Sequence, residues 1–174
     1  MGQQLKQDVF EGFAPYAGSP DGTGPDYRKM CEHANTMVPF SNHVGTRMVE
    51  IGPERGVVEI PADERMNNHM GSVHAGAQFL AAELAGAMAF GGAFAPVITR
   101  VKLFILRDST SKFLKPGFGR LRAIATLDPR TVADVLAGRV SGKFDLDGKA
   151  WLHDDDDVAV AKFSLDYVVD IPAA

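Results

Sequence analysis

One long apolar segment constrains the fold of this chain more than any other feature. Residues 75–98 are almost all Ala, Gly, Leu, Met and Phe, and Glu83 is the only charged residue among them. A window of this length must first be tested as a membrane span. Glu83, Gln78 and Pro96 lie inside it, and such interruptions are costly in lipid. We therefore expect a helix over Gly76–Phe90 that is buried on most of its sides in a protein core.

Composition indicates one compact globular domain. The chain has 174 residues, of which 45% are hydrophobic and 23% are charged, values that are ordinary for a single domain. Its net charge of -4 leaves no excess of Lys and Arg to neutralise a run of phosphates, so a nucleic-acid surface is not expected. The single cysteine, Cys31, excludes an internal disulfide and fits a reducing compartment. We expect a cytoplasmic protein without a nucleic-acid or membrane partner.

The remaining pattern predicts an N-terminal arm and a strand-rich domain. Residues 1–40 contain a stretch rich in Gly, Pro and Asp and a predicted short helix over Tyr27–Met37, which suggests an arm packed on a domain at 41–174. A second short helix is expected at Val132–Ala137. The predicted strands are Gly45–Gly52, Gly56–Ile60, Leu103–Leu106, Ser109–Leu114, Arg120–Leu127, Arg139–Leu146 and Val158–Val169. This order implies an α+β fold in which an antiparallel sheet wraps around one long central helix.

Glu83 is the first candidate for a catalytic residue. No Lys or Arg of the same helix can pair with it, because its neighbours three and four positions away are Phe79, Leu80, Gly86 and Ala87. A carboxylate in such apolar surroundings needs a partner from another segment, a wet pocket or a raised pKa. Those conditions suit a general base or a nucleophile. The alternative is that Glu83 lies at the one solvent-facing edge of the helix.

Polar residues stand immediately before this helix. Asn68 and His74, taken singly, are typical of turns and helix caps. The free N–H groups near Ala75 and Gly76 are suited to bind a carbonyl oxygen that gains negative charge. However, eight residues separate Ala75 from Glu83, which is about 12 Å along a helix, and reacting atoms must approach to about 3 to 3.5 Å. A site that uses both groups therefore requires a second, twofold-related chain, in a homodimer or a dimer of dimers.

The sequence resembles the hotdog-fold acyl-CoA thioesterases of the phenylacetate-pathway (PaaI-like) type. The similarity lies in Asn68, in His74-Ala75-Gly76 six residues later, and in Glu83 nine residues after His74. A second match is the segment 113–118, which precedes the alternating apolar residues of a strand. The family commonly has His-Gly-Gly where this chain has His-Ala-Gly, and the stretch from Glu83 to Pro116 is longer than usual. The resemblance implies hydrolysis of an acyl-CoA thioester without a cofactor or a metal.

The resemblance also implies a role for each matched residue. Glu83 would act as general base for water or as direct nucleophile on the thioester. Asn68 would orient the water or the acyl group, and His74 would support the loop. The backbone N–H of Ala75 would polarise the thioester carbonyl. Substrate contacts are expected at Gly76 and Phe79.

Two other functions use the same features. The hotdog dehydratases of fatty-acid synthesis pair a histidine with a glutamate fourteen residues later, and His69 and Glu83 have that spacing. The Pro-Gly that accompanies this pair in dehydratases is replaced here by Ala77-Gln78. A non-catalytic acyl-binding dimer is the third reading, with the segment 99–112 or the N-terminal arm covering the site. The four acids Asp154–Asp157 lack the pattern of a calcium loop and predict a solvated turn without a metal.

Overall fold

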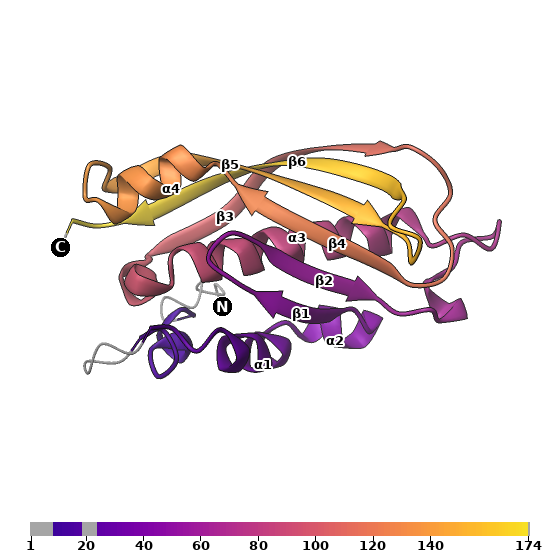
Figure 1. The fold of residues 1–174 in the computed structure, drawn as a ribbon, viewed down its shortest axis with the longest axis horizontal. Coiled ribbons are helices and arrows are strands. Elements are labelled where there is room, and N and C mark those ends of the chain that lie inside the picture. Colours follow the sequence, from indigo (N-terminus) through magenta and orange to yellow (C-terminus); the bar gives the residue numbers. More distant parts are fainter. Residues whose placement is uncertain (1–8, 19–23, 174) are drawn as a thin grey trace, which may run out of the picture.

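A computed structural model describes residues 9–18 and 24–173 and contains one six-stranded antiparallel sheet with the order β1-β2-β4-β5-β6-β3. The strands are β1 (Arg47–Ile51), β2 (Gly56–Ile60), β3 (Leu103–Phe113), β4 (Leu121–Leu127), β5 (Gly142–His153) and β6 (Ala159–Ile171). The helices are α1 (Tyr27–Met37), α2 (Pro39–Val44), α3 (Ala75–Ala93) and α4 (Pro129–Leu136), with short 3-10 turns η1 (Glu11–Phe13), η2 (Glu64–Met66) and η3 (Ala95–Arg100). The sheet curves around α3 (Figure 1). The predicted α+β hotdog architecture is confirmed.

The long apolar segment forms α3, which begins one residue before and ends three residues after the predicted span Gly76–Phe90. The His74 side chain caps its first turn, where Nδ1 accepts a hydrogen bond of 2.9 Å from the Gly76 N–H. Of the helices in the described residues, none is long and apolar enough to cross a membrane. The segment is instead the centre of the core, and thirteen of the nineteen residues of α3 are buried.

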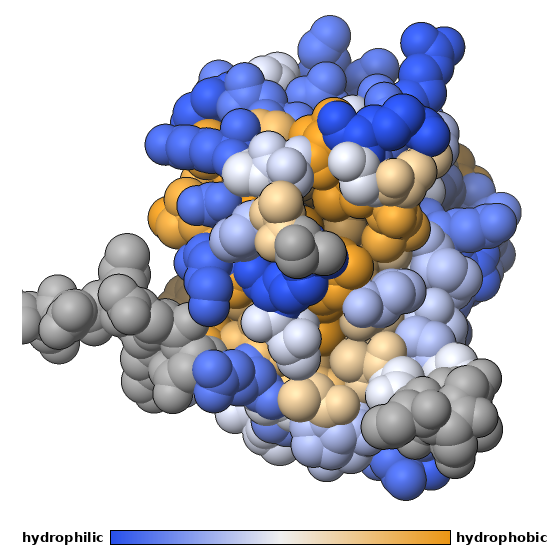
Figure 2. Space-filling view, turned by 90° about the vertical axis from the view of Figure 1, so that its left-hand side faces the viewer, coloured by the Kyte–Doolittle hydropathy of each residue, from blue (hydrophilic) through white to orange (hydrophobic). Residues whose placement is uncertain are grey.

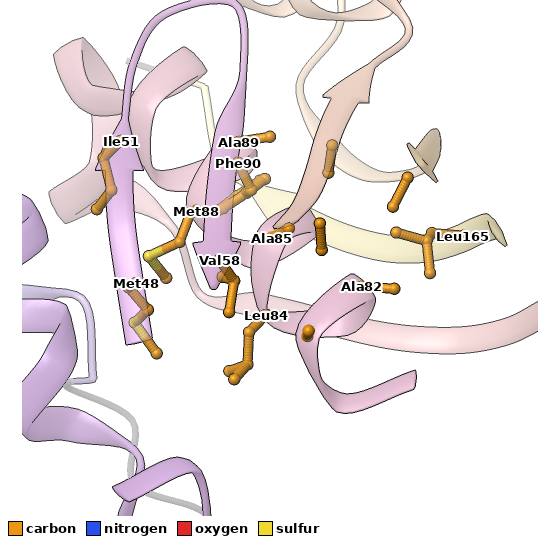
Figure 3. Packing of buried hydrophobic residues seen from close by; sticks show 14 of the residues in the cluster. Met48, Ile51, Val58, Ala82, Leu84, Ala85, Met88, Ala89, Phe90 and Leu165 are labelled. Carbon is orange, nitrogen blue, oxygen red and sulfur yellow. The ribbon is translucent and has the colours of Figure 1, made fainter. Parts of the chain in front are cut away.

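The core lies between α3 and the concave face of the sheet. Side chains from β1, β2 and α3 meet there, among them Met48, Val58, Leu84 and Met88 (Figure 3). A second part of the core lies under β6 and β3, where the ring of Phe104 stacks between Phe90 at 4.0 Å and Tyr167 at 4.6 Å. The burial of this apolar surface provides the main stabilisation of the fold.

The N-terminal region packs on the same core. The predicted helix Tyr27–Met37 is confirmed as α1, and its N-cap is the Asp26 side chain, which accepts from the Lys29 N–H. Met30 of α1 and Phe13 of η1 are buried. Sequence patterns did not predict α2, which runs across residue 40 and starts on a proline, and whose C-cap is Gly45 with a φ of 97°. The division into an arm and a domain remains an expectation.

Several strand boundaries differ from the prediction for identifiable reasons. The two strands expected at 103–106 and 109–114 form one strand, β3, because a register shift between Leu106 and Asp108 absorbs the break in the apolar pattern. The strand expected from Arg139 begins only at Gly142, since the Arg139 N–H still bonds to the Asp134 carbonyl at the end of α4. The acidic turn 154–157 lies between β5 and β6, and its acids pair with Arg120, which immediately precedes β4, and with Arg122 of β4.

An apolar groove reaches the surface at the end of the molecule where α4 and the end of α3 lie. Its volume is about 520 Å³, and the residues that line it include Ala89, Ala93, Leu127, Val132 and Leu136. Figure 2 shows this end, where hydrophobic residues lie between hydrophilic ones. The groove lies toward the C-terminal half of α3, beyond the turn that carries Glu83.

Two neighbouring glycines of α3 are expected to respond oppositely to substitution by alanine. A Cβ at Gly92 would collide with the backbone of Gly52 in the β1–β2 turn, whereas a Cβ at Gly91 would have no neighbour within 4 Å. We expect Gly92→Ala to destabilise the fold by about 1–3 kcal/mol and Gly91→Ala to stabilise it by about 0.5–1 kcal/mol. Thermal unfolding of both variants checks this pair, and an equal change in Tm would contradict the close approach of helix and turn.

Candidate active site

Glu83 lies on the stripe of α3 that faces β6 and the edge strand β3. One turn earlier, the ring of Phe79 is 6.1 Å from the ring of Phe163 on β6. Three residues later, Gly86 is so close to the Tyr167 hydroxyl that a Cβ there would collide with it. Glu83 therefore stands between two contacts with β6, and its side chain is half-buried.

The surroundings of Glu83 disfavour its charged form. Burial raises the pKa of the Glu83 carboxyl above its ordinary value, and in the described part of the chain no ion pair compensates the charge. The pKa of Tyr167 is also raised, first by burial and then by the negative charge of Glu83. Among the described residues, none forms a hydrogen bond with the buried Tyr167 hydroxyl. This apolar, weakly solvated setting suits a carboxylate that accepts a proton during catalysis.

Only one N–H group at the start of α3 stays free among the residues that the structure describes. The Gly76 N–H donates to His74 Nδ1, and the N–H groups of Ala77 and Gln78 donate to the His74 carbonyl. No acceptor is present for the Ala75 N–H, and Ala75 is exposed. Of the N–H groups expected to bind an oxyanion near Ala75 and Gly76, only the Ala75 N–H is therefore available. The positive end of the helix dipole lies at the same place and would also attract an oxyanion.

Asn68 shapes the loop before α3. Its Nδ2 donates to Ser72 Oγ at 2.9 Å, and its Oδ1 accepts from the Met70 N–H at 2.9 Å. The same loop is tied to the second matched segment, because the Val73 N–H donates to the Gly117 carbonyl at 2.8 Å. The two segments that carry the family resemblance are therefore joined in space at the start of α3.

One chain brings the predicted site residues into two groups. Asn68, His74 and Ala75 lie at the start of α3, whereas Phe79 and Glu83 lie one and two turns further along the helix. His69 and His74 are exposed, and within residues 9–18 and 24–173 no hydrogen bond joins either to Glu83. The two groups do not form one compact site within a single chain.

Sequence patterns missed three polar residues near the site. Ser72 is buried and bonds to Asn68, and Gln78 is buried with Nε2 donating to the Val73 carbonyl at 2.9 Å. Tyr167 is fully buried on the inner face of β6. A polar residue inside an apolar helix could have identified Gln78, and strand alternation could have placed Tyr167 inward. Ser72 has no comparable signal, because serine is common in loops.

The edge of the sheet beside Glu83 is open in the single chain. β3 is a terminal strand of eleven residues, and its outer edge carries no strand partner in the described chain. Large hydrophobic side chains are exposed on or beside it, with Ile105 at 45%, Phe113 at 49% and Leu114 at 50% exposure. A long edge of this kind is a template for pairing with another chain.

Comparisons with known proteins identify the family and the fold of the chain. The family described as a domain of unknown function (DUF4442) matches residues 28–169. A search of curated proteins finds no significant match. Among solved structures, the chain is similar to PA5026 of Pseudomonas aeruginosa, described as a probable thioesterase. That match has 25% identity and a TM-score of 0.69 and covers 83% of this chain and 95% of the other.

Two further structures share the fold at lower identity. The PaaI protein of the phenylacetic acid degradation operon of E. coli is 20% identical, with a TM-score of 0.61 and coverage of 83% and 94% of the two chains. Thioesterase HI1161 of Haemophilus influenzae is 17% identical, with a TM-score of 0.62 and coverage of 81% and 90%. These likenesses confirm the hotdog fold and the resemblance to PaaI-like proteins that the residues before and within α3 indicated.

Proposed function

From the premise that this chain belongs to the DUF4442 family and has the hotdog fold, we propose that it hydrolyses an acyl-CoA thioester to the free acid and coenzyme A. The observation that carries the proposal is the half-buried Glu83 on the central helix, which forms no ion pair with any other described residue and whose pKa is raised by burial. The names of similar structures, a probable thioesterase and a thioesterase among them, support a thioester as the substrate.

The chemical step needs only Glu83, water and a hydrogen-bond donor. Glu83 takes a proton from water while the water oxygen bonds to the thioester carbonyl carbon. The carbonyl oxygen becomes an oxyanion, which the Ala75 N–H stabilises. The carbon–sulfur bond then breaks, and the proton on Glu83 passes to the departing thiolate. The products are a carboxylic acid and a thiol, and Glu83 returns to its starting state. In the alternative, nucleophilic mechanism, the Glu83 carboxylate itself attacks the thioester carbonyl carbon and the thiolate leaves. Water later hydrolyses the resulting anhydride.

The site is shared between two chains in this proposal. The separation of about 12 Å between Ala75 and Glu83 along one helix prevents one chain from supplying both groups to one carbonyl. In an antiparallel pair of α3 helices, Glu83 of one chain approaches the Ala75 N–H of the partner subunit, and a second site forms by symmetry. The open β3 edge and its exposed hydrophobic residues supply a surface for such a dimer.

A panel of acyl-CoA substrates tests the proposed reaction directly. We expect the purified full chain to release free thiol from short, branched, aromatic or medium-chain acyl-CoAs, detected with a thiol reagent. The same panel includes a 3-hydroxyacyl-CoA and the matching enoyl-CoA. Interconversion of that pair without thiol release would favour the dehydratase reading through His69 and Glu83. Binding of an acyl-CoA without any turnover would favour a non-catalytic dimer.

A further inference from the structure

Three lysines gather on the face of the sheet that points away from α3. Lys112 of β3 stands directly opposite Lys162 of β6, and Lys149 lies on β5 beside them. They line a hollow of about 260 Å³ together with Thr110, Trp151, Phe163 and Ser164. The lining contains no acidic side chain, although the chain as a whole has a net charge of -4. Like charges directly opposite each other on neighbouring strands destabilise a sheet. An anion bound in this hollow would therefore reduce the repulsion between the lysine ammonium groups.

Arginines outside this hollow form ion pairs with acidic side chains. Arg107 pairs with Asp145 and Asp166 on the same face. Arg120 pairs with Asp155. In contrast, none of the ion pairs in the described residues includes the three lysines of the hollow. The lysines are therefore free to bind phosphate groups, which ammonium ions bind well.

Trp151 gives the hollow a flat aromatic wall. It is the only tryptophan of the chain, and 36% of it is exposed. The Lys162 Nζ lies 5.3 Å from the centre of its ring, so the indole orients that ammonium group by a cation–π interaction. An exposed indole is also a surface on which a nucleobase can stack. The hydroxyls of Thr110 and Ser164 add hydrogen-bond donors at the same place.

We propose that this hollow is a nucleotide-binding site, with the phosphates on Lys112, Lys149 and Lys162 and the base against Trp151. The residues next to these positions on β5 and β6, Ala150 and Ala161, are fully buried in the core and do not line the hollow, so the hollow and α3 lie on opposite faces of the sheet. The site is thus separate from Glu83 and does not depend on thioester hydrolysis. The ligand chemistry is an adenine-type base joined to a diphosphate, which ADP and coenzyme A both carry.

Titration of the full chain tests the site, with Trp151 as an internal fluorescence probe. We expect ADP and coenzyme A to change the tryptophan emission in a saturable way and to bind more weakly as salt rises. Binding of either supports the site, and their relative affinity identifies which of the two is preferred. Adenosine and inorganic pyrophosphate serve as half-ligands, and each should bind more weakly than ADP. Pyrophosphate that bound as tightly as ADP would overturn the assignment of the base to Trp151.

Charge-removing variants with a matched control make the test specific. We expect Lys112→Gln, Lys149→Gln and Lys162→Gln each to raise the Kd for ADP about threefold, and the triple variant to raise it about thirtyfold. Lys143→Gln, on the outward face of β5 but outside the hollow, should leave the Kd unchanged. Thiol release from acyl-CoA at saturating substrate should persist in all four single variants.

Other results would overturn the proposal. Absence of saturable binding by fluorescence and calorimetry, or equal Kd values in the triple variant and the parent, would exclude the site. The neighbouring hollow of about 400 Å³ is lined by Asp108, Asp147 and Asp166, so a second copy could dock acid against base. A fall in molecular mass by light scattering in the lysine variants, with no nucleotide binding in the parent, would assign the lysines to that contact instead.

Discussion

Replacement of Glu83 by glutamine is expected to lower kcat for acyl-CoA hydrolysis at least about 100-fold, the lower range for loss of a general base. The amide keeps the size of the side chain, but it can neither take the proton of the attacking water nor attack the thioester as a carboxylate. The measurement is the rate of thiol release at saturating substrate, with the parent chain in parallel. Full activity in Glu83→Gln would contradict the catalytic assignment.

The pH dependence of hydrolysis by the parent chain should show the ionisation of Glu83. The residue is active when ionised, and burial raises its pKa above the ordinary value for glutamate. Activity should therefore fall as the pH drops through this raised pKa, at a higher pH than an exposed glutamate would give. The residual rate of Glu83→Gln should lack this acidic limb. A parent profile without any limb in the acid range would indicate that another group limits the reaction.

Thermal stability shows whether Glu83→Gln loses activity because the carboxylate is absent or because the variant is unfolded. The folded-state pKa of Glu83 is raised, so between the ordinary and the raised pKa the unfolded chain loses its proton while the folded chain keeps it. The ionised carboxylate thus costs the folded parent stability as the pH rises through this window, and the cost persists above it. Glu83→Gln has no such charge. The Tm of Glu83→Gln should therefore be equal to or above that of the parent at pH 7 to 8. Well below the ordinary pKa of glutamate, the two Tm values should be the same.

The elements that the sequence predicted best are those with a long, unambiguous hydrophobic pattern. The helix around Gly76–Phe90 and the hairpin of β1 and β2 were predicted from local patterns, and both are present. The order of the predicted elements implied an antiparallel sheet around one helix, and the hotdog fold was implied by the family resemblance, which rests on the spacing of Asn68, His74 and Glu83 and on the segment 113–118. That spacing is informative because the turn, the cap and the carboxylate each need one position on the same loop and helix.

The features that were missed depend on contacts between distant segments. The extension of α3 to Ala93 is permitted by Gly92, which packs against the backbone of the β1–β2 turn. The continuity of β3 depends on its pairing with β6, which accommodates the bulge near Leu106. Tyr167 acquires its place beside Glu83 only when β6 covers α3. None of these contacts leaves a local signal in one sequence.

Removal of the Ala75 N–H is the second change with a large expected effect. Proline has no N–H and is favoured at the first position of a helix, which Ala75 occupies. The preceding His74 has φ -61° and ψ 138°, an extended conformation that a following proline requires. We therefore expect Ala75→Pro to fold normally and to lose about 100-fold to 1,000-fold in kcat, as for loss of one oxyanion donor. Ala75→Ser keeps the N–H and should retain activity, and equal rates for the two variants would contradict the role of this N–H.

Mixed dimers of the two inactive variants then determine whether one site draws on two chains. When Ala75→Pro and Glu83→Gln chains assemble at random, half of the dimers are mixed, and each mixed dimer has one site with neither substitution if the site is shared. Co-expression should therefore restore about one quarter of the parent activity, and mixed dimers isolated with two affinity tags should have about half. If Ala75 and Glu83 of the same chain formed each site, every site would carry a defect and no activity would return. The distance of about 12 Å between the two residues along one helix predicts the restoration.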